Sequence, residues 1–287
     1  MANSNGWGDG AGNNLIGWGQ GAVNNSIAWG DSHKKSWAGL TDIVGLAYET
    51  EYTAILDKAT ALGYTLPSEA VRTKQNTLLA AMKADGVWAK LDVFYVFAQD
   101  GGSAFATLNW KNPNANQSTL VSSPTFVSNG GFTGNGTSSY IDTNFNPATQ
   151  GVQYTQNDAS RYFFTHAIGT GRFDGNTSGV NSIFSGTSGS QRINAASNTV
   201  VPPLDYNSTV NTKSIHRTSS TSITAYNSTT AQTGVQTSAS ITSANQWILR
   251  SSTNYSTHTC AAYAMGASLI AEHSAFIADW NTYKNSL

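Results

Sequence analysis

The chain opens with three copies of an eleven-residue tryptophan–glycine repeat. Trp7, Trp18 and Trp29 take the same place in the aligned stretches GWGDGAGNNLI, GWGQGAVNNSI and AWGDSHKKSWA. A fixed period marks a repeated structural unit. A unit this short and rich in glycine cannot bury enough apolar surface to offset the conformational entropy of ordering its backbone. Residues 1–48 are therefore either disordered or ordered against a partner.

The aromatic content of this segment favours a partner. Disordered segments are poor in aromatic side chains, whereas this one carries Trp7, Trp18, Trp29 and Trp37. Gly-Trp-Gly triplets disfavour a helix, so we expect extended chain with turns at the Asn-Asn pairs. We interpret residues 1–48 as an anchor whose tryptophans are buried against sister chains or a larger surface.

Composition excludes several classes of protein. Only 11% of the 287 residues are charged and the net charge is −1, so no electrostatic argument supports nucleic-acid binding. The polarity comes from Ser, Thr, Asn and Gly, which is typical of β-structure with many turns. We expect a chain of this composition to work in a defined assembly, because its charge protects it only weakly against aggregation.

Compartment signals are equally sparse. The start of the chain has no basic cluster and no apolar stretch follows it, so we expect no signal peptide. The longest mostly apolar stretch, residues 260–271, is too short to span a bilayer, so we expect no membrane insertion. The single cysteine, Cys260, cannot form an intrachain disulfide and lies in an apolar run, where we expect a buried thiol.

Secondary-structure patterns divide the rest of the chain. Apolar spacing predicts a helix over 51–62 and a second one from 67–69 to near Gly86, followed by a strand over 91–97. From there to about residue 270, short β-like runs alternate with turns roughly every ten residues, which favours an all-β sandwich or barrel. A last helix is expected over 271–283. We therefore divide the chain into an anchor (1–48), a helical neck (49–100) and a β domain (101–287).

Three stretches of the β domain and the repeat itself support a family resemblance. Residues 134–143 (GNGTSSYIDT) resemble a strand of the concanavalin A-like, laminin-G-like jelly rolls found in phage structural proteins. Residues 216–226 are similar to a paired strand of that sandwich, and residues 263–269 to its closing strand. The repeat and the stretch that ends at Gly45 resemble N-terminal segments of structural proteins from phages of Bacteroidetes bacteria.

This resemblance covers nearly the whole chain and implies a function. It implies a mainly β protein at the virion surface of a tailed phage, a head fibre or decoration protein that is homotrimeric. Residues 1–48 would then attach it to the capsid or other virion proteins, and the jelly roll would display a lectin-like surface to host or environmental glycans. A tail-fibre adhesin, a free carbohydrate-binding module and a glycan hydrolase remain as alternatives.

The acidic residues argue against catalysis. Glycan hydrolysis needs two carboxylates that flank the scissile bond, and the hydrolases of this class carry two Glu on one strand. No Glu occurs between Glu69 and Glu272, so we expect no enzyme. The histidines lack metal-ligand spacing, so we expect neither a metal nor another cofactor.

Glycan-binding candidates follow from residue type. Sugars offer apolar ring faces and many hydroxyls, so their sites combine an aromatic ring with Asn, Asp or Arg. In the expected polar loops of the sandwich, the candidates are Arg172, Asp174, Asn176, Arg192 and Tyr206.

Overall fold

The computed structural model places residues 48–287 in one compact unit, and residues 1–47 do not belong to it. The anchor tryptophans Trp7, Trp18, Trp29 and Trp37 lie outside the described residues, so the expectations for the repeat stay predictions. The structure describes residues 48–179, 181–184, 190–196, 199–200, 204, 206 and 210–287.

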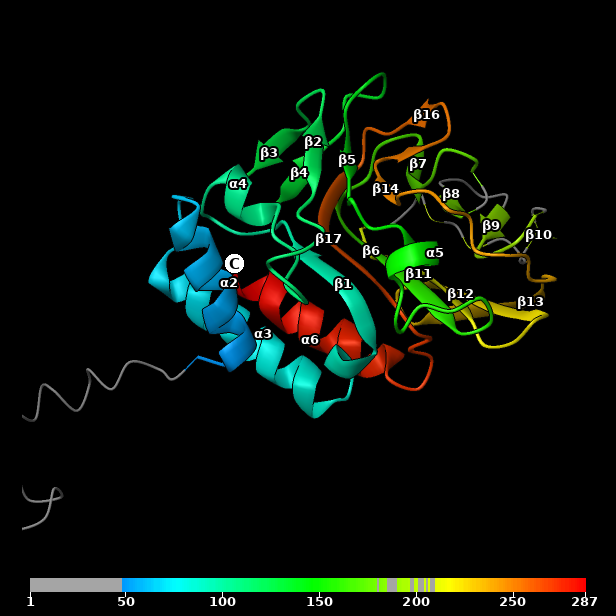
Figure 1. Ribbon diagram of the computed structural model, residues 1–287, viewed down its shortest axis with the longest axis horizontal. Coiled ribbons are helices and arrows are strands. Elements are labelled where there is room, and N and C mark those ends of the chain that lie inside the picture. The colour runs from blue at the N-terminus through cyan, green and yellow to red at the C-terminus, as the bar shows by residue number, and fades with distance from the viewer. Residues whose placement is uncertain are drawn as a thin grey trace, which may run out of the picture. The chain divides into compact units, whose positions relative to one another are not determined.

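Two antiparallel sheets dominate the described residues (Figure 1). The first, sheet A, has eight strands. Their order is β13 (Thr230–Val235), β12 (Ser222–Asn227), β11 (Thr212–Arg217), β6 (Ala159–Ala167), β17 (Thr259–Gly266), β4 (Gly131–Thr133) and β3 (Thr125–Val127), with β1 (Leu91–Val96) paired to β17 on the β4 side.

The second sheet, sheet B, has seven described strands. Their order is β10 (Thr199–Val200), β9 (Ser190–Arg192), β8 (Ser182–Phe184), β7 (Arg172–Gly175), β14 (Trp247–Ile248), β5 (Tyr140–Asp142) and β2 (Thr119–Val121). A short hairpin of β15 (Arg250–Ser251) and β16 (Asn254–Tyr255) follows β14.

The two sheets pack face to face around one core. Phe163 and Tyr263 from sheet A meet Ile141, Phe173 and Ile248 from sheet B in the same buried cluster. The chain crosses between the sheets repeatedly, from β5 to β6 to β7 and from β13 to β14 to β17, as expected for a jelly-roll sandwich. The mainly β fold class is confirmed.

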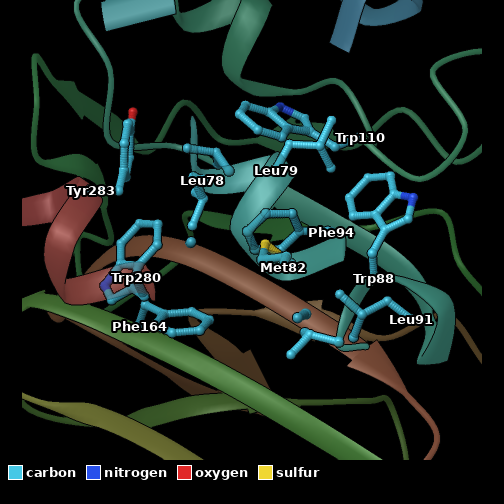
Figure 2. Packing of buried hydrophobic residues seen from close by; sticks show 14 of the residues in the cluster. Leu78, Leu79, Met82, Trp88, Leu91, Phe94, Trp110, Phe164, Trp280 and Tyr283 are labelled. Atoms are coloured by element: carbon cyan, nitrogen blue, oxygen red, sulfur yellow. The ribbon is translucent and has the colours of Figure 1, made fainter. Parts of the chain in front are cut away.

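Helices cover the other face of sheet A. They are α2 (Thr50–Ala61), α3 (Glu69–Ala84) and α6 (His273–Ser286), and Figure 1 shows them gathered beside β1. Leu79, Met82 and Trp280 from these helices pack with Phe94 and Phe164 of the sheet in a second buried cluster (Figure 2). Sheet A therefore has a buried cluster on each face, and residues 48–287 form three layers.

Residues 49–100 differ from the helical neck that we expected. We expected a helical neck that precedes the β domain, but the compact unit begins at Tyr48 and β1 is a strand of sheet A. The physical reason is the apolar outer face of sheet A, where Phe94 and Phe164 need cover from water. The helices supply that cover and are part of the sandwich domain.

The individual helices agree with the sequence. Ser68 caps α3 by accepting the backbone N–H of Val71 at 3.4 Å, and Gly86 follows the helix with a φ of +75°. Three shorter helical segments complete the described elements: η4 (Trp88–Lys90), α4 (Ser103–Ala106) and α5 (Pro147–Gln150). Among the described helices, none has both the length and the apolar character needed to cross a membrane.

The stretch 134–143 differs from its expectation in one respect. Only Tyr140–Asp142 form a strand, because the Asn135 side-chain oxygen accepts the backbone N–H groups of Thr137, Ser138 and Ser139 at 2.8–3.0 Å and folds the GNGTSS segment into a loop.

Candidate functional site

Three of the five glycan-binding candidates are buried. Asp174, Asn176 and Tyr206 are at most 1% exposed, so they cannot contact a sugar in this structure. The reason for Asp174 is its strand position, since it pairs with Ile248 and points with it into the core between the sheets.

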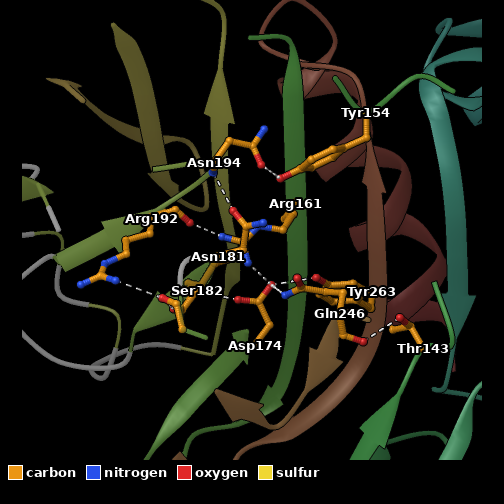
Figure 3. Close-up of polar contacts among 12 residues, drawn as sticks. Thr143, Tyr154, Arg161, Asp174, Asn181, Ser182, Arg192, Asn194, Gln246 and Tyr263 are labelled. Atoms are coloured by element: carbon orange, nitrogen blue, oxygen red, sulfur yellow. Dashed lines mark hydrogen bonds and ion pairs between the residues drawn. The ribbon is translucent and has the colours of Figure 1, made fainter. Parts of the chain in front are cut away.

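Asp174 instead joins the two sheets from inside (Figure 3). Its Oδ2 atom lies 2.8 Å from Arg161 Nη1 of sheet A and accepts the Tyr263 hydroxyl at 2.7 Å. Its Oδ1 atom accepts the backbone N–H of Ile183 at 2.6 Å. Burial raises the pKa of the Asp174 carboxyl, and the Arg161 guanidinium opposes that rise. This carboxylate is a structural link of the sandwich.

The other two candidates remain partly exposed. Arg192 donates from Nη1 to the Gly179 carbonyl at 3.4 Å, and Arg172 begins β7. Burial, with Arg192 as a second cause, lowers the pKa of Arg172.

An aromatic surface does form on the outer face of sheet B. Trp247 is cross-strand neighbour to Asp142 and to Gly175, while the adjacent Ile248 pairs with Ile141. Because Ile141 and Ile248 face the core, the alternation of strand side chains puts Tyr140, Asp142 and Trp247 on the opposite, outer face. Tyr140 and Trp247 touch there, with ring centroids 5.2 Å apart.

Arg250 completes this surface. Its guanidinium carbon lies 4.1 Å from the Trp247 ring centroid, 4.6 Å from that of Tyr140 and 4.7 Å from that of Tyr255. Stacking on three rings fixes the guanidinium plane through cation–π attraction. We call Tyr140, Trp247, Arg250 and Tyr255 the platform.

A strained residue brings Arg250 to this face. Regular alternation after Trp247 would turn Arg250 inward, but Ile248 and Leu249 both lie in the core. Leu249 has a φ of +67°, a left-handed conformation that is costly for a bulky side chain. This kink ends β14, and the chain returns Arg250 to the outer face beside Trp247. Backbone strain of this kind is concentrated at functional sites in proteins.

A glycine lets the hairpin lie close to the sheet. A Cβ atom on Gly175 of β7 would lie 2.2 Å from Ser251 Oγ and 2.3 Å from Ser251 Cβ. Only glycine leaves room for β15 at this point, and β15 carries Arg250. The position of Arg250 therefore depends on both the Leu249 kink and the absence of a side chain at Gly175.

Polar groups border the platform. Asp142 Oδ2 accepts the Trp247 Nε1–H at 3.2 Å, and its Oδ1 accepts the Asn245 amide at 3.1 Å. Arg250 donates from Nε to the Ser252 carbonyl at 2.8 Å, and within the described residues its two terminal nitrogens have no hydrogen-bond partner. Asp142, Asn245, Arg250, Tyr140 and Tyr255 are all partly exposed. The surface therefore combines ring faces with acceptors and donors that a ligand can reach.

The sequence alone predicts part of this aromatic surface. The alternation in Tyr140-Ile141-Asp142 predicts that Tyr140 and Asp142 share one face of their strand. In the same way, Trp247 and Ile248 are predicted to lie on opposite faces of theirs. Their meeting depends on the pairing of β5 with β14, more than a hundred residues apart, and no local pattern shows that pairing.

The described acidic residues, histidines and cysteine do not form a metal site. Within them, no group of three or more His, Cys, Asp or Glu side chains is arranged to hold a metal ion. Cys260 is buried, as expected, and burial raises the pKa of its thiol well above the usual value. His258 is buried too, and burial lowers its pKa to about 4.

No protein-family model matches the chain, and no curated protein matches it in sequence. One structural match is domain 4 of AbnA, an extracellular arabinanase of family GH43 from Geobacillus stearothermophilus, solved in complex with arabinotriose. The match has a TM-score of 0.38 and 9% sequence identity, and covers 66% of this chain and 98% of that domain.

Proposed function

We propose that this chain is a non-enzymatic structural protein of a tailed-phage virion whose β-sandwich binds glycans through the platform. The observation that carries the glycan-binding part is the stacking of Arg250 on Tyr140, Trp247 and Tyr255 beside the Asp142 carboxylate. The virion part rests on the resemblance of the repeat and of the jelly-roll strands to phage structural proteins.

The platform suits a sugar for physical reasons. The half-exposed rings of Tyr140 and Tyr255 offer apolar area to the C–H face of a sugar ring. The terminal nitrogens of Arg250 can donate hydrogen bonds to sugar hydroxyls, and the Asp142 carboxylate can accept hydrogen bonds from them. Because cation–π stacking already orders the guanidinium, little conformational entropy remains to be lost when a ligand binds.

In the proposed virion role, each part of the chain has its own function. In this proposal, residues 1–48 anchor the protein to the capsid or to other virion proteins, and the compact unit is displayed at the virion surface as a homotrimer. We propose a head fibre or decoration protein. A tail-fibre adhesin would use the same platform, while a free carbohydrate-binding module or a hydrolase would not need the anchor.

A glycan array probed with the full-length chain tests the binding function. We expect at least one immobilised glycan to retain the chain. Tyr140→Ala and Tyr255→Ala should each weaken that binding about tenfold, or about 1.4 kcal/mol. Tyr48→Ala is the matched control, because Tyr48 is another half-buried tyrosine but packs beside Tyr52 in the helical layer.

Two results would contradict this function. One is an array on which no glycan retains the chain. The other is a glycan whose binding Tyr140→Ala and Tyr255→Ala leave unchanged. Release of reducing sugar from a polysaccharide by the wild-type chain would instead favour the hydrolase alternative.

The anchor is tested separately on virions. Replacing Trp7, Trp18 and Trp29 with Ala should strip the chain from purified particles while its circular dichroism spectrum keeps the β signal of the compact unit. Immunogold labelling of wild-type particles then decides between head and tail attachment. Retention of the triple variant at wild-type occupancy would contradict the anchor.

A further inference from the structure

A cavity of about 230 Å³ opens on the outer face of sheet A, where α6 ends. One wall comes from the last turns of α6, with Trp280, Asn281, Lys284 and Asn285. The opposite wall includes Val210 and Ser228, which flank β11 and β12. It is formed by different elements from the platform, which lies on sheet B.

The described lining of this cavity is mostly polar and contains no acidic side chain. The amides of Asn281 and Asn285 can each donate and accept hydrogen bonds. Trp280 supplies an apolar wall and is held in place by Phe164, whose ring centroid lies 4.6 Å from its own. Paired donors and acceptors beside an indole match a ring that carries several hydroxyl groups.

The charge at the cavity is positive or neutral. Lys284 donates to the Asn129 carbonyl at 2.9 Å, which holds its ammonium at the cavity wall. His166 lines the cavity as well, and burial together with the Lys284 charge lowers its pKa. Among the lining residues that the structure describes, no carboxylate would balance a cationic ligand.

The size of the cavity limits the ligand. At about 30 Å³ for each water in the liquid, its volume of about 230 Å³ equals that of roughly seven or eight waters. Sites for drug-sized ligands range over about 300–1,000 Å³. The cavity is therefore smaller than a site for a drug-sized ligand, and its size suits one sugar ring.

We propose that the cavity beside α6 binds the terminal sugar residue of a glycan, and that this residue carries no positive charge. The choice of a sugar as the ligand class rests on the proposed function, whereas the location and the charge preference rest on the cavity itself. A chain with this second site would contact a glycan end-on at sheet A and along ring faces at the platform.

NMR titration of the full-length chain with methyl glycosides of neutral hexoses tests this proposal. We expect one of them to bind with millimolar affinity and to shift the side-chain amide signals of Asn281 and Asn285. Glucosamine, which carries an ammonium group, should bind at least tenfold more weakly, because Lys284 and His166 face it without an acid.

Variants locate the binding. Val210→Trp should fill the cavity and lower the affinity at least tenfold, because Val210 is 55% exposed and its enlargement disturbs no core contact. Val235→Trp is the matched control, since Val235 is 74% exposed on β13 and does not line the cavity. Asn281→Ala should lower the affinity without filling the cavity.

The same titration separates the two sites. Tyr140→Ala should leave methyl glycoside binding at the cavity unchanged. The cavity proposal is overturned if no neutral hexose binds, if Val210→Trp binds as tightly as wild type, or if glucosamine binds equally well. If methyl glycosides bind at the cavity but no glycan on the array depends on Tyr140 and Tyr255, only the platform proposal is overturned.

Discussion

Two arginines show how differently the interior and the outer face of this sandwich use the same side chain. Arg161 is buried between the sheets and lies 2.8 Å from the Asp174 carboxylate. Arg250 is partly exposed and stacks on three aromatic rings, with no carboxylate in an ion pair within the described residues. The first arginine satisfies a buried charge and holds the sheets together. The second keeps donors available at the surface.

In a chain with few charges, the exposed arginine is the one that a ligand can reach. An ion pair buried between two sheets is out of reach of a ligand, however suitable its residue types are. A guanidinium held by rings keeps its orientation while its terminal nitrogens remain free to donate.

The buried pair should control stability. Asp174→Asn leaves the Arg161 charge without its partner between the sheets, which should lower the free energy of unfolding by about 3–5 kcal/mol. Asp142→Asn, on the outer face, should change it by less than about 1 kcal/mol. Urea denaturation of both variants measures the difference, and equal losses would remove the distinction between interior and outer face.

A methyl group on Gly175 should disturb both regions at once. Gly175→Ala puts a Cβ about where Ser251 lies, so β15 must move away from the sheet. We expect a loss of about 1–3 kcal/mol in unfolding free energy and, because Arg250 moves with β15, a weaker hold on any arrayed glycan. Gly179→Ala separates backbone strain from a clash: its Cβ would meet no atom closer than 3.8 Å, but its φ of +67° is unfavourable for alanine, so this variant should cost stability without displacing β15. Glycan binding by Gly175→Ala at wild-type strength would show that the position of Arg250 is unimportant.

Acid should weaken the interior through its histidines. Burial lowers the pKa of His216, His273 and His258, the last to about 4. The unfolded chain therefore binds protons that the folded chain does not. Stability is complete above the unfolded pKa of about 6.5 and falls as the pH drops below it, by up to about 1.4 kcal/mol per pH unit for each histidine.

Denaturation curves between pH 7.5 and 4.5 check this pH dependence. His216→Gln should flatten the slope below pH 6.5, because His216 packs between Tyr162 and Tyr226 and accepts the Leu269 N–H in its neutral form. An unfolding free energy that stays constant over this range would contradict the assignment of neutral, buried histidines.

The smallest effect is expected for a conservative change on the platform. Arg250→Lys keeps the charge but loses the planar group that stacks on Trp247 and Tyr140, which should weaken glycan binding a few-fold and change stability by less than about 1 kcal/mol. Array binding and urea denaturation measure the two quantities. An affinity equal to that of wild type would show that charge alone suffices.

Local patterns explain which parts of the fold the sequence predicts. The cap at Ser68, the glycine at Gly86 and the apolar spacing of Phe276, Ile277 and Trp280 are short-range signals, and α3 and α6 form where they indicate. The cover that helices give to sheet A is a long-range consequence of its apolar outer face. Periodicity in one segment does not contain that information.

The candidate site was less predictable for a related reason. Asp174 has the residue type of a sugar ligand, but its register against Ile248 turns it inward. Trp247 and Tyr140 meet only because β14 pairs with β5, and Arg250 reaches them only through the left-handed backbone of Leu249. Residue type identified the chemistry, whereas strand register and one strained residue decided which side chains carry it.

The most direct test observes both arginines in one sample. The Nε–H resonances of Arg250 and Arg161 would be followed by NMR while the full-length chain is titrated with a glycan that it retains on the array. The account predicts that the Arg250 resonance shifts with saturation while that of Arg161 stays in place. Saturable binding that leaves the Arg250 resonance unmoved would contradict a glycan site on the outer face of sheet B.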